Sequence, residues 1–226
     1  MDKQIATAMM TPQTIHRPAQ PIPALPCHIP LPDSSTSSTS GEATPTYSIR
    51  PHLSTDVRQL VVGLNDRRVA EWMTNRIASP YTEQLGRGFL EYLDGEEGAG
   101  KGRWDFAIVE HTSEEAEEGQ GRLVGGIGLK FNDPEEVHGR TVELGYWLAK
   151  DRWGKGVVSA VVPRFVEWVW LALPGINRME AQVYGGNERS VGVLVRAGIE
   201  LEGKLRGKLR KDGELKDLWM YGLVRT

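Results

Sequence analysis

The stretch DRWGKGVVS, residues 151–159, combines the residue types that a phosphate-binding turn needs. It follows an apolar, strand-like run at 142–149 and precedes a long apolar stretch typical of a helix. The start of a helix presents unpaired N–H groups and the positive end of its dipole, and glycines let an anion approach the backbone. Lys155 adds a positive charge, and Ser159 adds a hydroxyl one helical turn later. These residues indicate an anion site at a helix start, with a plain tight turn as the alternative.

A second glycine-rich stretch, GEEGAGKG at residues 95–102, nearly matches the phosphate loop of nucleotide-binding enzymes. Gly102 stands where that motif has the hydroxyl that holds Mg²⁺. The motif also requires a strand before it and a helix after it, whereas here an expected helix precedes and an expected strand follows. The sequence therefore predicts a polar loop at this position.

Two further clusters of reactive or charged residue types predict no chemistry. Cys27 and His28 are neighbours, but no second cysteine or suitably spaced histidine completes a metal site, so we expect no metal. The acidic run EEAEE at 114–118 is expected to form a solvated loop. Attraction of a cationic amine or a basic partner is the alternative for that run.

Length and composition limit the class of protein. The 226 residues suffice for one domain with a proper core, or at most for two small ones. The hydrophobic content of 39% and charged content of 25% are typical of globular proteins, and the net charge of −3 argues against a nucleic-acid binder. The single cysteine fits a reducing compartment, and no apolar run approaches the roughly 20 residues of a membrane span. We expect a cytoplasmic protein without nucleic-acid or membrane partners.

The chain divides into a tail and one domain. Residues 1–45 are rich in proline, serine and threonine and poor in core-forming residues, which predicts a disordered tail. Residues 46–226 are expected to form a mixed α/β domain of order β-α-α-β-β-β-α-β-α-β-β. The expected strands are 47–53, 103–110, 122–131, 141–149, 178–184, 201–210 and 215–225. The expected helices are 54–73, capped by Ser54 or Thr55, 79–93, capped by Thr82, 155–172, and 187–199, ended by Gly198.

Four motifs in this domain resemble the GNAT superfamily of acyl-CoA-dependent N-acetyltransferases, and within it the RimJ/RimL-type branch. VELGYWLAKDRWGKG (142–156) resembles the branch's strand and glycine turn, and NERS with RAGI (187–199) resembles its Asn-x-x-Ser helix. The closing hairpin (203–223) and the first strand with its Asn-Asp helix segment (47–84) match as well. The motifs occur in the family's order. The resemblance covers 47–226 and implies a GNAT-like fold, in which helices flank a central, mostly antiparallel sheet.

Four positions depart from the family's pattern. Asp151 replaces the common Gln or Arg three residues before the first turn glycine, and Ala160 replaces the usual Glu. Ile199 replaces a common Phe, and Pro163 falls inside the expected helix, where it removes a hydrogen bond. Asp151 weakens a side-chain contact to the pyrophosphate but leaves the backbone contacts of the turn intact.

The resemblance implies acetyl-CoA as the co-substrate and no metal. The main-chain N–H groups near Leu148 are expected to polarise the thioester carbonyl. Asn187 is expected either to hold the pantetheine arm or to cap its helix. The full set of expected contacts to the co-substrate is Leu148, Ala149, Arg152, Trp153, Gly154, Lys155, Gly156, Val157, Ser159 and Asn187.

Acetyl transfer to an amine also requires a base, because an alkylamine with a pKa of about 10 is protonated at neutral pH. Glu143, on the strand before the turn, is the first candidate base, and Asp217 on the closing hairpin is its rival. Ser190 is the candidate acid that returns a proton to the thiolate, although it could instead cap its helix. Tyr146 and Trp147 are expected to pack in the core or to line the acceptor pocket.

We therefore expect an acetyl-CoA-dependent N-acetyltransferase that acts by direct attack of the amine in a ternary complex. The acceptor is a protein N-terminus or a small amine. The alternative is an acyl-CoA-binding module without turnover, which acts as a sensor or scaffold.

Overall fold

The computed structural model describes residues 25, 29–30, 45–75, 77–94, 103–111, 121–133 and 136–226. The expected polar loop at 95–102, the acidic run at 114–118 and the Cys27–His28 pair lie outside these residues. So does most of the expected tail.

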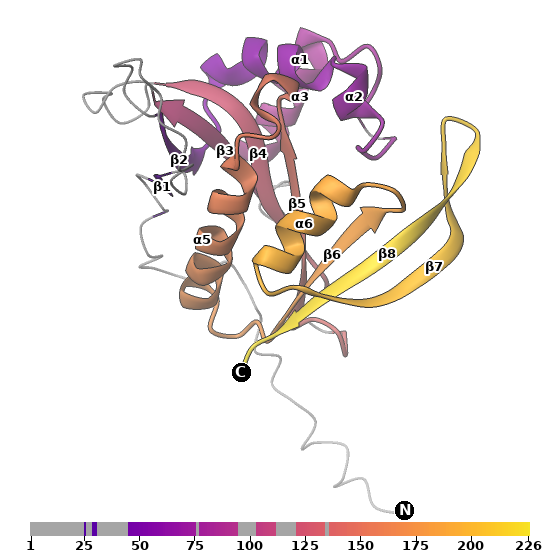
Figure 1. Ribbon diagram of the computed structural model, residues 1–226. Helices are drawn as coiled ribbons and strands as arrows, with labels where there is room; N and C mark the ends of the chain where they lie inside the picture. Colours follow the sequence, from indigo (N-terminus) through magenta and orange to yellow (C-terminus); the bar gives the residue numbers. More distant parts are fainter. Residues whose placement is uncertain are drawn as a thin grey trace, which may run out of the picture.

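The domain is built on one eight-stranded sheet in the order β1-β2-β3-β4-β5-β6-β8-β7 (Figure 1). All neighbouring strands are antiparallel except β5 and β6, which are parallel. This confirms the expected mixed α/β fold with a mostly antiparallel sheet. The strands are β1 (Ile29–Pro30), β2 (Thr46–Pro51), β3 (Arg103–His111), β4 (Arg122–Phe131), β5 (Thr141–Leu148), β6 (Arg178–Tyr184), β7 (Glu200–Lys211) and β8 (Glu214–Val224).

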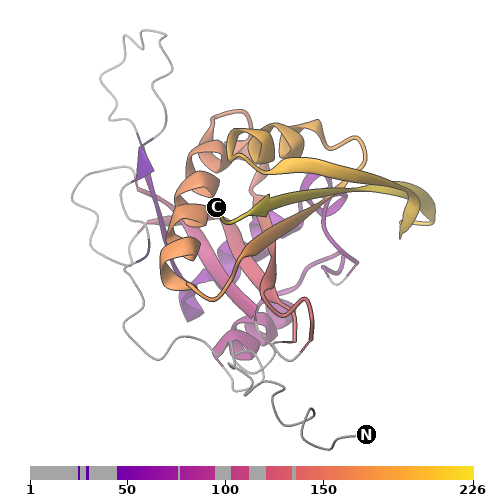
Figure 2. The ribbon, with the colours of Figure 1, turned by 90° about the horizontal axis from the view of Figure 1, so that it is seen from below.

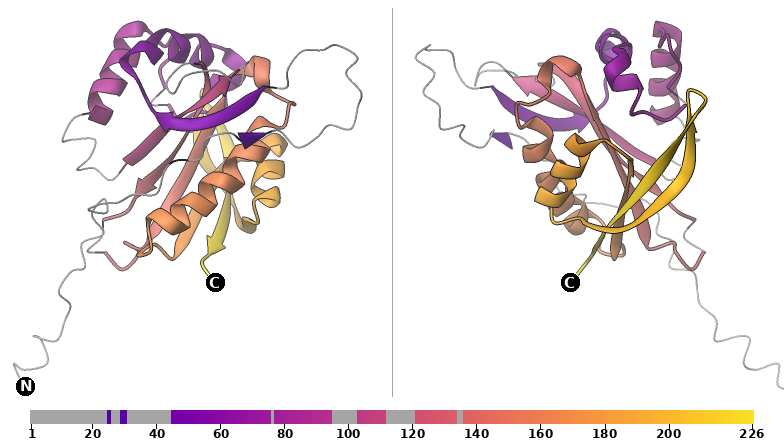
Figure 3. Two further views of the ribbon diagram at one scale, coloured as in Figure 1. Left: turned by 90° about the vertical axis from the view of Figure 1, so that its left-hand side faces the viewer. Right: turned by 45° about the vertical axis from the view of Figure 1, so that its right-hand side comes forward.

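Helices cover both faces of this sheet (Figures 1 and 2). The core between the sheet and α5 and α6 is centred on Phe165, Met179 and Leu194, and a second core lies under α1 and α3 around Leu60 and Leu90. The two sides are seen in the two views of Figure 3. The helices are η1 (Ser54–Asp56), α1 (Val57–Leu64), α2 (Arg67–Ala70), α3 (Glu83–Asp94), η2 (Lys150–Arg152), α5 (Val157–Ala172) and α6 (Glu188–Arg196).

The expected single helix at 54–73 is wrong, because the chain breaks it into η1, α1 and α2. Asn65 ends α1 by pairing with the backbone of Tyr81: its amide donates to the Tyr81 carbonyl at 2.6 Å and its oxygen accepts from the Tyr81 N–H at 2.8 Å. Asp66 then adopts an extended conformation and caps α2. The expected cap by Ser54 or Thr55 is also wrong, since α1 begins after Asp56. Thr82 does accept from the Leu85 N–H at 3.3 Å, as expected of a cap.

Part of the expected tail lies on the sheet. Ile29 and Pro30 pair with Tyr47 and Thr46 at the edge of β2, and Leu25 packs against the core under α5. A domain boundary at residue 46 therefore stays a prediction, with these three residues adding contacts upstream of it.

The entry into α1 is held by a buried carboxylate. Arg50 donates to both oxygens of Asp56 at 2.8 Å, and the Leu53 N–H donates to it at 2.8 Å. Burial alone would raise the pKa of Asp56, but the hydrogen bonds from Arg50 and Leu53, together with His52 Nδ1 at 3.7 Å, outweigh burial and hold that pKa well below its ordinary value. The ionised carboxylate therefore stabilises the folded state at neutral pH.

We expect Asp56→Asn to lower the free energy of unfolding at pH 7 by about 3–5 kcal/mol, because it leaves Arg50 without its counter-charge. Denaturant titration measures this loss. Because the folded pKa is depressed, the parent loses the contribution as pH falls below about 4, so the difference between parent and variant should shrink there. A constant difference between pH 7 and pH 3 would contradict this origin. Asp66→Asn, which removes a carboxylate that is only partly buried and keeps a capping side chain, is the matched control.

Candidate active site

Strands β5 and β6 part halfway along their length. Thr141–Leu144 pair with Arg178–Ala181, whereas Gly145–Leu148 pair only with β4. The Ala149 N–H donates to the Val124 carbonyl at 2.7 Å, which fixes the alternation of the ladder. By that alternation the backbone N–H groups of Tyr146 and Leu148 point away from β4, toward the place where β6 has diverged. The divergence thus offers backbone donors to a ligand.

The glycine turn follows directly after these donors. Gly154 and Gly156 have φ of +75° and +78°, a left-handed conformation that other residues rarely adopt. A Cβ at either position would meet nothing within 4 Å, so open space lies beside both. The first intrahelical bond of α5 runs from Ala160 to Gly156, so the N–H groups of the preceding helical residues, 157–159, have no carbonyl one turn earlier. The α5 helix then runs through Pro163 without interruption.

Cations surround the turn. The Lys150 ammonium lies 4.7 Å from the centroid of the Trp153 ring, and the guanidinium of Arg189 on α6 lies 5.1 Å from it. The Trp153 indole also donates to the Leu148 carbonyl at 2.8 Å, which ties the turn to β5. Lys155 is exposed on the turn itself. Arg189 was missed by sequence reasoning, because only the packing of α6 against the turn brings it there.

The side chain of Arg152 is engaged away from the glycines. It donates to both oxygens of Glu110 on β3, at 2.7 and 2.6 Å, and to Asp151 at 2.8 Å. Burial would raise the pKa of Glu110, but hydrogen bonds from Arg152 and Tyr47 hold it below its ordinary value. Asp151, the departure noted above, also pairs with Arg122 at 2.8 Å. This network anchors the turn to β2 and β3.

The start of α6 carries the Asn-x-x-Ser motif. The Asn187 side-chain oxygen accepts from the Ser190 N–H at 3.2 Å, so it caps the helix. The Ser190 hydroxyl lies 2.7 Å from the Tyr146 hydroxyl of β5. Burial raises the pKa of the Tyr146 hydroxyl to about 12. A hydrogen bond therefore joins β5 to α6 across the diverging strands.

The two candidate bases lie in different surroundings. Glu143 is about one-third exposed and pairs with Lys130 at 3.6 Å. It lies on the face of β5 opposite to Tyr146, and Gly145, next on the Glu143 face, has open space beside it. Asp217 accepts from the Gly207 N–H at 2.8 Å and so stabilises an irregular stretch of β7.

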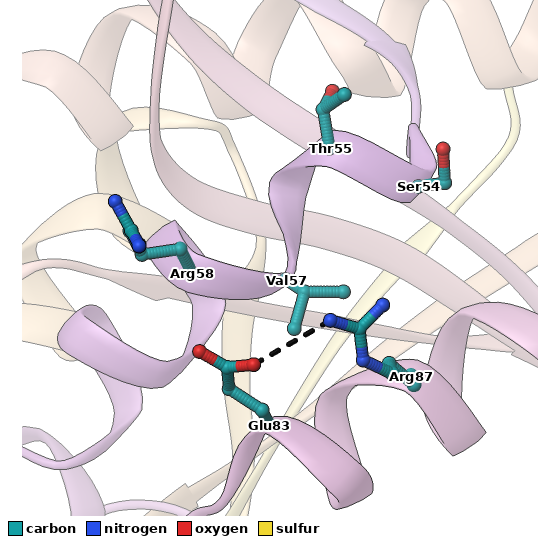
Figure 4. Close-up of a pocket in the computed structure, with 6 residues that line it drawn as sticks. All are labelled: Ser54, Thr55, Val57, Arg58, Glu83 and Arg87. Atoms are coloured by element: carbon teal, nitrogen blue, oxygen red, sulfur yellow. Dashed lines mark hydrogen bonds and ion pairs between the residues drawn. The ribbon is translucent and has the colours of Figure 1, made fainter.

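A separate pocket of about 240 Å³ lies at the start of α1 and α3 (Figure 4). None of the expected site residues lines it, and Glu83 and Arg87 on its rim form an ion pair at 3.5 Å. Its volume is below the roughly 300 Å³ at which ligand pockets begin. In the parts of the chain described above, no group of three or more His, Cys, Asp or Glu residues is placed to hold a metal ion, and no helix is long and apolar enough to span a membrane.

Comparison with known proteins decides the family. The model of the GNAT acetyltransferase domain matches residues 48–200. The chain belongs to the GNAT acetyltransferase family. It is thus an acyltransferase, and solved structures of RimJ and RimL share its fold.

Three of these neighbours show the extent of the likeness. The chain is 28% identical over 162 residues to the uncharacterized N-acetyltransferase p20 of Bacillus licheniformis. The aligned residues cover 71% of this chain and 83% of p20. The structure of Mycobacterium smegmatis RimJ in complex with CoA-disulfide has a TM-score of 0.65 and 21% identity, and covers 79% of this chain and 82% of RimJ. The ribosomal-protein-S5-alanine acetyltransferase from Vibrio fischeri has a TM-score of 0.62 and 20% identity, with 79% and 93% covered. At these identities the two structures show the shared fold.

Proposed function

We propose that this GNAT protein moves the acetyl group of acetyl-CoA to a primary amine by direct attack in a ternary complex. The observation that carries the proposal is the divergence of β5 and β6 immediately before the glycine turn. On one continuous stretch, Tyr146–Ser159, backbone N–H groups that point away from β4 are followed by the start of α5, and this order supports a site for a thioester and its phosphates. A thioester on a phosphate-bearing arm needs both in this order.

The residues present fit the phosphates of coenzyme A. Open space beside Gly154 and Gly156 admits an anion to the N–H groups of residues 157–159, and the dipole of α5 favours negative charge there. The ammonium of Lys155 and the guanidinium of Arg189 supply the counter-charges. In this proposal Arg152 contributes its backbone and its anchoring role, because its guanidinium is held by Glu110.

The acyl and pantetheine portion would follow β5. The Leu148 N–H points into the divergence and is placed to donate to the thioester carbonyl, where negative charge develops during attack. Ala149 and Trp153 support this backbone, because the Ala149 N–H bonds to β4 and the Trp153 indole bonds to the Leu148 carbonyl. The Asn187 amide nitrogen is available to the arm, since only the oxygen is used in capping α6.

In this proposal, groups on the two faces of β5 carry out different proton transfers. Glu143 takes a proton from the incoming ammonium, and the amine nitrogen then forms a bond to the carbonyl carbon. As the C–S bond breaks, its electron pair goes to sulfur, which takes the hydroxyl proton of Ser190. The second proton that the amine nitrogen loses restores the Ser190 hydroxyl, and the proton on Glu143 passes to solvent, so the net products are the amide, the thiol and one released proton. Because β5 and β6 diverge here, Glu143 and Ser190 can act on the same thioester from opposite faces of β5.

Open space beside Gly145 indicates that the acceptor approaches on the Glu143 face. A neighbour with the same fold is named for acetylating an alanine of ribosomal protein S5, so peptides with a free N-terminus are the first acceptors to test. Small amines are the second class.

Thiol release from acetyl-CoA, measured with a panel of peptides, polyamines and amino sugars, tests this function. We expect release with at least one class of primary amine and none with the same compounds after N-acetylation. Tight binding of acetyl-CoA by calorimetry, without thiol release from any compound, would instead make the chain an acyl-CoA-binding module.

A further inference from the structure

We propose that Tyr146 is a positioning residue that directs the hydrogen of Ser190 toward the departing sulfur. This inference rests on the proposed function. It starts from the 2.7 Å contact between the two hydroxyls, which are separated by 44 positions in the chain.

Tyr146 stands where the sheet opens. Its strand pairs with β6 up to Leu144 and then continues alone beside β4. From there the phenol crosses to the first turn of α6, where its oxygen lies 2.7 Å from Ser190 Oγ and 3.3 Å from the Ser190 carbonyl. The contact therefore borders the space that the thioester would occupy.

The direction of this hydrogen bond follows from acidity. The 2.7 Å contact allows either hydroxyl to donate. A phenol is a stronger acid than an alcohol, so we take Tyr146 as the donor and Ser190 Oγ as the acceptor; the other acceptor within reach of the phenol, the Ser190 carbonyl, is farther away at 3.3 Å. Burial raises the pKa of Tyr146 to about 12, which keeps its hydrogen in place at neutral pH. No proton needs to leave the phenol: its role is to occupy one lone pair of the serine oxygen.

Ser190 is then fixed from two sides. Asn187 holds its backbone N–H, and Tyr146 holds its oxygen, so the serine's own hydrogen is left to turn toward another acceptor. A thiolate formed at the end of β5 is such an acceptor. Without Tyr146 the hydroxyl could rotate and donate to a nearby backbone carbonyl, as serine side chains within helices do.

A double-mutant comparison tests the coupling. We expect Tyr146→Phe to lower kcat about tenfold, the size of one hydrogen bond, with the KM for acetyl-CoA unchanged. Ser190→Ala should lower kcat about 10²-fold. Adding Tyr146→Phe to Ser190→Ala should cost nothing more, whereas adding it to Ser190→Thr, which keeps a hydroxyl, should again cost about tenfold.

Tyr81→Phe is the matched control, because Tyr81 is a buried tyrosine of the α1–α3 core. It should leave kcat unchanged. An equal loss from Tyr146→Phe in the parent and in Ser190→Ala would overturn the inference and assign Tyr146 to packing alone. If the parent releases no thiol with any amine, the proposed function fails and this inference fails with it.

Discussion

Glu143→Gln is expected to lower kcat/KM for acetyl transfer by roughly 10²–10⁴-fold while leaving acetyl-CoA affinity unchanged. Glutamine keeps the shape of the side chain and its hydrogen bonding but cannot accept the proton of the incoming ammonium. The loss should shrink at high pH, because an amine with a pKa of about 10 then arrives neutral. Steady-state kinetics from pH 7 to pH 10, with calorimetry of acetyl-CoA binding, measure both parts.

Two carboxylates serve as controls for this result. Glu180 lies in register with Glu143 on β6 but is bound by Arg178 at 2.8 Å, so Glu180→Gln should have a much smaller effect on turnover. Asp217→Asn keeps an oxygen for the Gly207 N–H and should fold normally. If Glu143→Gln matches the parent while folded Asp217→Asn is inactive, the base is Asp217.

Gly156→Asp should weaken binding of coenzyme A by on the order of 10²-fold, which corresponds to about 2.7 kcal/mol. It places a carboxylate at the start of α5, where the phosphate is proposed to lie. Because Gly156 has a positive φ, an aspartate there also strains the backbone. We expect stability to fall by much less than affinity, and titration calorimetry and thermal unfolding measure the two changes separately.

Gly156→Asn is the matched variant for the turn. Asn and Asp have nearly the same shape, and both tolerate positive φ better than other side chains, so the pair differs mainly in charge. Asn should bind coenzyme A clearly more tightly than Asp. Equal affinity of Gly156→Asp and the parent would remove the turn from the binding site.

Local patterns predicted the regular elements well. The expected strands at 122–131 and 178–184 coincide with β4 and β6, because the buried apolar run of β4 and the alternation along β6 are both local properties of the sequence. The break after Leu64 was not predictable in this way, since Asn65 pairs with Tyr81, sixteen positions away. A side chain that bonds to a distant backbone overrides the helical spacing around it.

The same limit of prediction from local sequence applies to the candidate site. The glycine turn was predicted in its place, because a strand, two glycines and a helix are consecutive in the chain. The engagement of Arg152 by Glu110, 42 positions away, was not, and neither was the link between Tyr146 and Ser190. Sequence reasoning thus predicted where the strand, the glycine turn and the helix lie but not which of their side chains are held by others.

The short pairing of β5 with β6 has a consequence for the order of folding. β3, β4 and β5 are consecutive antiparallel strands, and β7 and β8 form a hairpin. These local pairs close small loops, whereas β5 and β6 meet only after the whole α5 crossover has formed. We expect these antiparallel pairs to form first and the four residue pairs between β5 and β6 to form last. The least stable strand pairing of the sheet would then border the place where substrate is proposed to bind.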